Sequence, residues 1–408
     1  MRAVQRDDRA ALHRAIAMRE ATGSMSNREA AWLAKAVAEH EIGAAFGADA
    51  IDRVRDVRPC AHELDGALAA RMKVHDAAGA AAALARIEAG RLDVDDARGF
   101  ALDSQPDWRA VAARGLVRPE DRVARLRALA DPDPTVRRQA VRAAQDAKDM
   151  ADLGALAEAA RVDPEPIVRT EAVRAMARLE SSSKSSEVVD ILRDLWKSGD
   201  EGLREDIALA WSGPVLWSCG GRDALHVVVA EQHGPAAIEA AASVLRRRDA
   251  DPEITLTALA LLARSIETGP PRTRLQALAQ APLDRSDLLP VVRRAASDDD
   301  LQVRVGALAR LAEAKDPRAI EELESLSRAG SPVADRARFA LAAAGDRRVQ
   351  AWVEGDLVVG RPEQRLAAAT ELAAMGVSAR GAPLLADGDA SVRMRAACAL
   401  MRGERRAH

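Results

Sequence analysis

The chain has 408 residues, of which 48% are hydrophobic and 30% charged, and its formal net charge is -3. It has no Tyr, three Phe and six Trp, whereas sandwiches and barrels rely on β-branched and aromatic residues in their strands. Abundant Ala, Leu, Arg and Glu instead favour helices and predict an all-α protein. The nearly balanced charge gives no general attraction to nucleic acid or to an anionic membrane.

Residues 1–92 are expected to form a helical N-terminal capping region. Four segments in it are typical of helices: ALHRAIAMREA, NREAAWLAKAVAEHEIGAAF, AHELDGALAARMKVH and AAGAAAALARIEAG. None carries the motif that recurs later in the chain. Because the terminal units of a stacked array must present a polar outer face, we expect this region to close one end of the array. The first residues also lack the apolar run of a signal peptide.

From residue 93 to 408 a motif recurs about every thirty residues. DPDPTVRRQAVRAA at 131–144 and DPEPIVRTEAVRAM at 163–176 are nearly identical. DDDLQVRVGALARL at 298–311 and DGDASVRMRAACAL at 387–400 follow the same plan, and weaker copies stand between them. A period near thirty in a helical sequence indicates a stacked repeat array.

Each repeat is expected to consist of two helices joined by a short turn. The Asp-Pro pair predicts where the second helix begins, since Asp caps free N–H groups and Pro fits the first helical turn. One apolar stripe runs along that helix, as at Val168, Ala172, Val173, Met176 and Leu179. Two departures are expected: a Ser-rich loop at 181–186, and an irregular repeat connection at 211–221 with the sequence WSGPVLWSCGG.

The pattern D-P-x-x-x-V-R-x-x-A-V-x-A-L resembles the HEAT-type repeat, in the short bacterial form also found in phycobilisome-lyase-like proteins. The resemblance covers residues 93–402. It implies a right-handed, armadillo-like α-solenoid of about ten helix pairs, whose second helices line the concave surface. Arrays of this kind serve as scaffolds, adaptors, lyase chaperones and occasionally DNA-repair enzymes, so the resemblance specifies the fold more closely than the function.

The resemblance also implies a structural ladder, in which the Arg of each Val-Arg pair reaches an acidic residue at a turn and links one repeat to the next. The expected members are Arg137, Arg169, Arg204, Arg304, Arg365 and Arg393, with Asp133, Asp163, Asp200, Asp300 and Asp389 as partners. A row of ligand-binding arginines is the alternative. Because Ala334 lies where the Arg belongs and Gln364 replaces the Val, the ladder should be interrupted near these positions.

A second set of side chains is the candidate for partner binding. It consists of Arg138, Arg142, Arg174, Arg178 and Arg310, together with Trp211 and Trp217. The arginines lie on second helices outside the motif position and could form a mildly basic concave strip, which acidic neighbours dilute. A solvated helical face is the alternative; nucleic acid is disfavoured, because a surface that follows phosphates carries a larger uncompensated charge. The tryptophans either fill the core or line a groove at the irregular connection.

No catalytic, cofactor-binding or metal-binding residue is assigned. Cys219, His226 and His233 lack a standard zinc spacing, and HELDG at 62–66 has Gly66 where HExxH requires a second His. The three cysteines are far apart and form no CxxC pair, so we expect small buried residues and no disulfide framework.

The sequence thus predicts a non-enzymatic, monomeric HEAT-repeat scaffold or adaptor that binds a protein or peptide partner on its concave surface. The alternative is a lyase-like or DNA-glycosylase-like solenoid acting on a bulky ligand, which would need an inward-facing acid beside Trp211 or Trp217. No run of about eighteen apolar residues predicts a membrane span. The compartment stays open: cytoplasmic by default, or the periplasm or cell envelope if the chain is a mature fragment.

Overall fold

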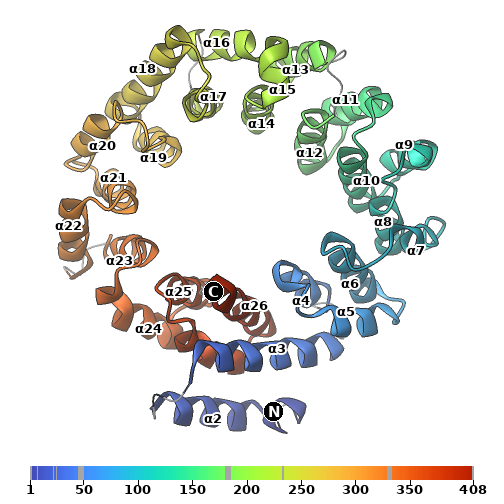
Figure 1. Ribbon diagram of the computed structural model, residues 1–408, viewed down its shortest axis with the longest axis vertical. Coiled ribbons are helices and arrows are strands. Elements are labelled where there is room, and N and C mark those ends of the chain that lie inside the picture. The colour runs from blue at the N-terminus through green and yellow to red at the C-terminus, as the bar shows by residue number, and fades with distance from the viewer. Residues whose placement is uncertain are drawn as a thin grey trace. The chain divides into compact units, whose positions relative to one another are not determined.

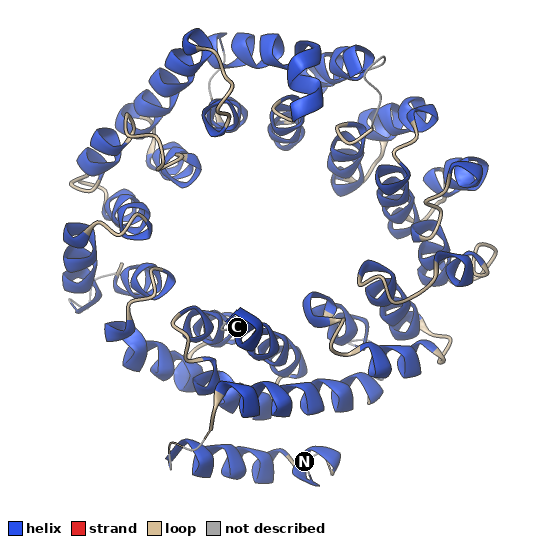
Figure 2. Ribbon diagram, in the orientation of Figure 1, coloured by secondary structure: helices blue, strands red, loops and turns tan. Residues whose placement is uncertain are grey.

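The computed structural model describes residues 2–6, 8–21, 23, 25–44, 50–179, 185–231, 234–328 and 333–406. Over these ranges the regular structure is helical and contains no strand (Figure 2). The predicted all-α class is therefore confirmed. The chain forms two compact units: unit 1 contains Met1–Ala97 and Leu323–His408, and unit 2 contains Arg98–Glu322. These units follow the packing; the boundary expected at residue 92 concerns the repeat pattern and stays a prediction.

Unit 2 is a curved row of helices in two layers (Figure 1). The inner layer, on the concave side of the row, consists of α8 (Pro106–Arg114), α10 (Pro134–Ala147), α12 (Pro166–Met176), α14 (Glu201–Trp211), α17 (Pro235–Arg246), α19 (Pro271–Gln280) and α21 (Leu301–Glu313). The outer layer consists of α9 (Arg122–Leu129), α11 (Leu153–Val162), α13 (Ser185–Ser198), α16 (Arg222–Glu231), α18 (Pro252–Thr268), α20 (Leu289–Ala295) and the start of α22 (Pro317–Arg328).

The Asp-Pro pair begins α10 as predicted, whereas α12 begins at Pro166 after Glu165, whose side chain makes no capping bond. Asp133 accepts a hydrogen bond from the backbone N–H of Thr135 at 2.8 Å, and Pro134 occupies the first helical position. The predicted apolar stripe of α12 is buried along its whole length, from Val168 to Leu179. Alanines pack between the larger side chains, as where Ala110 and Ala113 meet Val136 and Ala140, and such small residues let α8 and α10 approach closely.

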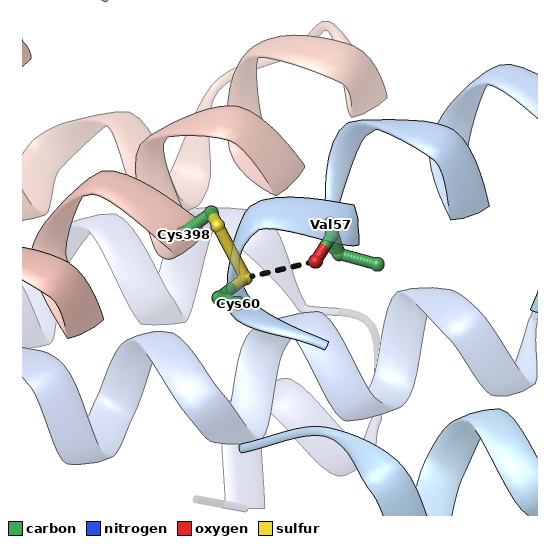
Figure 3. Close-up of a disulfide and its surroundings, with 3 residues drawn as sticks. All are labelled: Val57, Cys60 and Cys398. Atoms are coloured by element: carbon green, nitrogen blue, oxygen red, sulfur yellow. Dashed lines mark hydrogen bonds between the residues drawn. A yellow bond between two sulfur atoms is a disulfide. The ribbon is translucent and has the colours of Figure 1, made fainter. Parts of the chain in front are cut away.

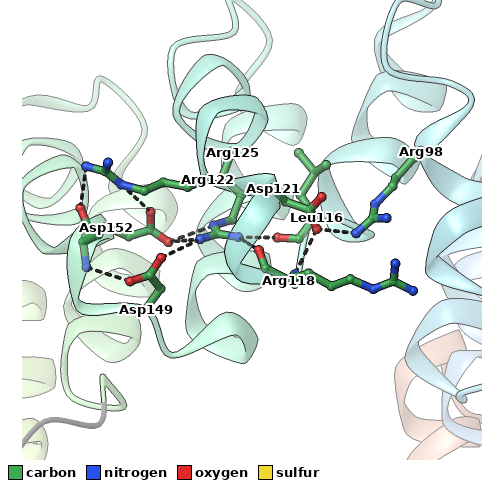
Figure 4. A network of polar contacts seen from close by, with 9 residues as sticks. Arg98, Leu116, Arg118, Asp121, Arg122, Arg125, Asp149 and Asp152 are labelled. Carbon is green, nitrogen blue, oxygen red and sulfur yellow. Dashed lines mark hydrogen bonds and ion pairs between the residues drawn. The ribbon is translucent and has the colours of Figure 1, made fainter.

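A buried polar network joins neighbouring repeats in the outer layer (Figure 4). Arg125 on α9 is fully buried and donates to the carboxylate of Asp152 at 2.8 Å and to the carbonyl oxygens of Leu116 and Arg118 at 3.1 and 2.6 Å. Asp152 is also fully buried, and burial raises its pKa although Arg125 opposes the change. Since a buried charge must be paired to be tolerated, this pair ties α9 to the turn that precedes α11.

Unit 1 combines the two ends of the chain. Its N-terminal helices are α1 (Arg2–Gln5), α2 (Arg9–Ala21), α3 (Asn27–Gly43), α4 (Ala50–Asp56), α5 (Asp65–Met72), α6 (Ala77–Glu88) and most of α7 (Val94–Arg98). Its C-terminal helices are α23 (Ala334–Ala343), α24 (Gln350–Val359), α25 (Pro362–Ala374), the 3₁₀ segment η6 (Ser378–Ala386) and α26 (Ala390–Arg406). The N-terminal helices were expected to close one end of the array, and α3 and α4 pack on α26, the last repeat helix.

One apolar core runs through this contact. Ala34, Val37 and Ala38 of α3 are buried together with Met394 and Leu400 of α26. The predicted absence of disulfides is wrong, because Cys60 and Cys398 are bonded within this core (Figure 3). The two residues are separated by 338 positions, so only the packing of the chain's two ends brings them together.

Two further expectations concern the Ser-rich loop and membrane-spanning helices. Residues 181–184 of the expected Ser-rich loop lie outside the described residues, and Ser185 already begins α13. The helices in the described ranges include none with both the length and the apolar character that crossing a bilayer requires.

Candidate functional site

Several motif arginines link repeats through an Asp at the turn before the second helix of the next repeat. Arg137 donates to both carboxylate oxygens of Asp163, at 2.7 and 3.0 Å, and also to the backbone carbonyls of Asp131 and Pro132. Arg365 reaches Asp387 in the same way, at 2.9 Å. Arg109 bonds Asp131 at 3.0 Å, and this guanidinium lowers the pKa of Asp131. Arg169 donates to Asp200 at 2.9 Å, and Asp200 also caps α14.

Three of the expected acidic partners have another role. Asp133, Asp300 and Asp389 accept hydrogen bonds from the backbone N–H groups of their own helices, so they cap helices and do not bind the ladder arginines. The turns at 131–133, 163–165 and 387–389 have the form D-x-D or D-x-E. In each, the first Asp binds the Arg of the preceding repeat, and the acidic residue two positions later immediately precedes the helix. The predicted interruption at Gln364 is also wrong, because Arg365 reaches Asp387 whatever residue precedes it.

Three motif arginines bind elsewhere. Arg304 donates to the carbonyl of Asp298 in its own turn at 2.9 Å. Arg204 donates to the carbonyl of Trp196 at 2.9 Å and lies over its ring. Arg393 binds Glu41 of α3, at 2.7 and 2.6 Å, so the motif of the last repeat reaches an acid near the N-terminus.

The arginines of the expected concave strip are bonded, with one exception. Arg138 and Arg142 both bind Glu171 of the next inner helix, at 2.7 and 3.0 Å, and Arg174 binds Asp206 at 2.7 Å. Arg310 donates to the carbonyls of Leu278 and Ala281 at 3.1 and 2.7 Å and also pairs with Glu313. Arg178 is exposed, and its side chain forms no hydrogen bond or ion pair with another described residue. Arg138 and Arg142 therefore complete a second set of links between repeats.

Both predicted tryptophans are core residues. Trp211 is only 1% exposed and Trp217 is 8% exposed, and the guanidinium of Arg247 lies 4.5 Å from the ring centre of Trp217. Sequence reasoning missed Trp196 on α13, which is half-buried and pairs with Trp211 at 5.4 Å between ring centres. An aromatic residue on an amphipathic helix, fifteen positions before Trp211, was the available signal.

A groove of about 490 Å³ opens beside this tryptophan pair. Its floor and walls consist of Trp196, Trp211, Ala224, Val227 and Val228, and the charged groups along it are Arg193, Lys197 and Asp223. The side chain of Val227 is 53% exposed although it is apolar. The groove is thus an accessible, mostly apolar surface between two outer helices.

The irregular connection produces this groove. α14 ends at Trp211, and a short turn of helix, α15 (Pro214–Leu216), leads into a π-helical segment, η4 (Trp217–Gly221), in which Gly220 has a φ of 107°. α13 packs on α15 and η4, and α16 packs on η4. Because this segment lies between them, α13 and α16 do not form the close contact that α16 and α18 make farther along the outer layer.

The groove contains no evident catalytic group. Its one carboxylate, Asp223, is 66% exposed and pairs with Arg222 at 3.2 Å. Cys219 is a free thiol, His226 lies 4.0 Å from Glu253, and His233 lies outside the described residues. Across the described ranges, no cluster of three or more His, Cys, Asp or Glu side chains is arranged to hold a metal ion.

One carboxyl in unit 1, that of Glu371, has a strongly raised pKa. Burial raises the pKa of Glu371 on α25 to about 7. No hydrogen bond or ion pair joins its side chain to another described residue, whereas acid–base catalysis needs a second group within reach. We therefore assign no reaction to Glu371.

Comparison with known proteins identifies the repeats. A family model described as HEAT repeats matches residues 96–177 and 123–212, and no curated protein matches the chain. Among solved structures, a Kap121p mutant is 12% identical with a TM-score of 0.35, over 94% of this chain and 46% of that one. The karyopherin Kap121p bound to the extreme C-terminus of the protein phosphatase Cdc14p is 15% identical with a TM-score of 0.29, over 86% and 38%. The chain spans less than half the length of either solved chain.

Proposed function

Since this chain is a HEAT-repeat protein, we propose that it is a non-enzymatic scaffold that binds a protein or peptide partner. The observation that carries the proposal is the groove between α13 and α16, with its exposed Val227 beside Trp196 and Trp211. Tryptophan is enriched among the residues that dominate binding energies, particularly where a pocket excludes water. The groove volume is within the range of sites that hold small ligands or a few side chains.

A helical segment is the partner structure that fits best. The groove lies between two outer helices that the α15–η4 segment holds apart, so a helix lying there would supply the helix–helix packing that other outer helices obtain from each other. Such a helix would present apolar residues to Val227, Val228 and Trp196, as in helix-in-groove recognition. Arg193 and Lys197 along the α13 wall favour an acidic residue on that side of the partner.

The concave strip is a second proposed contact surface. Arg138, Arg142 and Arg174 are held in place by carboxylates, which reduces both their net charge and their freedom. A rigid surface loses little entropy on binding, so these side chains could recognise a partner by shape and hydrogen bonding. Arg178 carries the charge that is not compensated there.

The test of the groove compares two exposed valines. Val227→Asp places a charge in the groove, whereas Val162→Asp places one on the 60%-exposed Val162 at the end of α11. Proteins captured by the wild-type chain and by Val162→Asp, but lost with Val227→Asp, are the expected partners. For each purified partner, affinity should fall at least about tenfold, which corresponds to about 1.4 kcal/mol. Equal affinities for both variants would exclude the groove as the site.

The concave strip needs a different variant. Arg142→Glu would leave Glu171 facing a like charge and would disturb the fold, so its effect on binding would be ambiguous. Arg178→Glu breaks no side-chain bond to a described residue and should change affinity by no more than about 1 kcal/mol if the residue lies at an interface rim. A partner that loses affinity with Arg178→Glu and not with Val227→Asp would place recognition on the concave side.

A further inference from the structure

We propose that the Cys60–Cys398 disulfide is a redox-controlled latch that holds the N-terminal helices over the last repeat of unit 1. The bond joins the short 3₁₀ turn Arg58–Cys60 to the middle of α26 (Figure 3). It is the covalent link in a contact that otherwise depends on apolar packing and on polar side-chain contacts. The inference concerns unit 1 and does not depend on the groove proposed above.

The surface under the latch is a repeat face. Met394, Ala397, Leu400 and Met401 of α26 are buried in the core shared with the N-terminal helices. In a stacked array the corresponding face of each repeat packs on the next repeat. On α26 the helices α3 and α4 occupy this position. If the N-terminal helices moved away, an apolar helix face would become available to a partner.

Polar contacts align the same two segments without the disulfide. Arg393 binds Glu41 in a buried pair, and Ser391 donates to Asp56. The side-chain amide of Asn27 donates to the carbonyl of Gly376 at 3.2 Å and accepts from the N–H of Ala379 at 2.9 Å. These contacts keep the Cα atoms of Cys60 and Cys398 near their 5.5 Å separation. The reduced thiols therefore stay next to each other, and the bond can form again.

Burial controls when the bond can be reduced. Cys60 and Cys398 are 1% and 4% exposed, so a reductant reaches either sulfur only after the contact opens locally. A dithiol reductant then attacks as thiolate, forms a mixed disulfide and releases one cysteine thiolate, which takes up a proton. Its second thiol displaces the other cysteine. Two electrons and two protons pass to the protein, and the reductant becomes a disulfide.

The reduced state has a stabilising contact of its own, and the oxidised state depends on the redox conditions of the compartment. The sulfur of Cys60 lies 3.3 Å from the carbonyl oxygen of Val57 (Figure 3), which the thiol form can use as an acceptor. Disulfides form and persist in oxidising compartments. The latch therefore favours the periplasm or cell envelope over the cytoplasm as the place where the closed form accumulates.

The experiment follows hydrogen exchange of the full chain before and after treatment with dithiothreitol. Oxidised protein, denatured, should show one free thiol, Cys219, and reduced protein three. On reduction, amides of 27–43 and 390–403 should exchange at least about tenfold faster, because the local opening is no longer limited by the bond. Amides of 134–147 in unit 2 should be unchanged, and oxidised glutathione should restore the original protection.

Cys219→Ser is the matched control, since it removes the one free thiol and leaves the latch intact. It should show no free thiol when oxidised and the same exchange response as wild type. Cys398→Ser should behave as reduced protein even without reductant; if it fails to fold, wild type with reductant supplies the same comparison. Three free thiols in the oxidised protein, or equal protection of 27–43 in both redox states, would overturn the latch.

Discussion

The regular repeats of unit 2, at α9–α12, and the irregular segment at α13–α16 differ in the bond that the motif Arg makes. Arg137 bonds Asp163 of the following repeat. Arg204 has no such acid ahead of it, because α17 begins after Gly234, and it turns back to the carbonyl and ring of Trp196. The missing cap is supplied by Glu201, which accepts a hydrogen bond from the N–H of Ala236 at 2.8 Å.

This difference shows what the ladder does. Where the turn supplies an Asp, as at Asp131 and Asp163, an Arg of the preceding repeat binds it, and the outer helices α9, α11 and α13 pack in succession. Where the turn lacks that Asp, Arg204 binds the carbonyl and ring of the half-buried Trp196 instead, and α15 and η4 lie between α13 and α16. The accessible groove occurs at the second kind of place, so the proposed binding site and an interrupted ladder coincide in the same repeat.

The largest expected loss of stability comes from removing the buried charge of Arg125 in the regular repeats. Arg125→Ala leaves Asp152 buried without its cation and should lower the free energy of unfolding by about 3–5 kcal/mol. Urea denaturation followed by circular dichroism measures the change. Arg125→Met with Asp152→Leu removes both charges and should recover most of the loss. A loss below about 1 kcal/mol for Arg125→Ala would mean that the buried pair does not hold the regular repeats together.

Local patterns predicted the regular repeats well, because their signals lie within a few residues. The cap at Asp133, the Pro at the first position and the stripe from Val168 to Leu179 all follow from short-range rules. The same rules could not separate Asp131 from Asp133, since both precede the same helix and only the position of Arg109 distinguishes them.

Those short-range rules could not predict contacts between residues that lie far apart in the sequence. Trp196 and Trp211 meet because of how α13 packs on α14, and Cys60 meets Cys398 because the two chain ends share a core. Nothing in the spacing of either pair indicates the contact. The individual pairs of the concave-strip arginines could not be assigned for the same reason, as Glu171 and Asp206 lie on the next repeat.

A glycine pair tests whether the irregular segment is as closely packed as its geometry indicates. A Cβ at Gly221 would lie 2.6 Å from the carbonyl oxygen of Trp211 and 2.7 Å from that of Leu216. Gly221→Ala should therefore lower stability by about 1–3 kcal/mol, because the neighbouring backbone must move. Thermal unfolding and the fluorescence of Trp196 and Trp211 should both change.

Gly154 in α11 is the control from the regular region. A Cβ there meets no atom within 4 Å, so Gly154→Ala should raise stability by about 0.4–1 kcal/mol by restricting the unfolded chain. The two substitutions should thus have opposite signs. A stabilising Gly221→Ala would show that the segment between α13 and α16 is loosely packed and that the groove has no fixed shape.

The smallest expected effect is on how thermal stability depends on pH, and its sign differs between the irregular segment and the regular repeats. Burial raises the pKa of Glu205 on α14, and the charges of Glu201, Glu239 and Asp206 raise it further. Glu205 holds its proton more tightly in the folded protein than in the unfolded chain. The contribution of Glu205 to stability is therefore present at pH values below its ordinary pKa of 4.5, and it is lost as the pH rises through the raised pKa. Glu205→Gln should then raise the Tm at about pH 7.5, by roughly 1–2 °C, and leave it unchanged at about pH 4.

Asp131 in the regular region should behave in the opposite way. Its pKa is lowered by Arg109, so the folded form releases the proton more readily, and its contribution is present above the ordinary value of 3.8 and is lost as the pH falls through the lowered pKa. Asp131→Asn should therefore lower the Tm at about pH 7.5, and the difference from wild type should shrink towards about pH 3. If both variants changed the Tm with the same sign at neutral pH, the carboxylates of the irregular repeat would be as well paired as those of the ladder. The interrupted ladder would then not explain why the groove opens where it does.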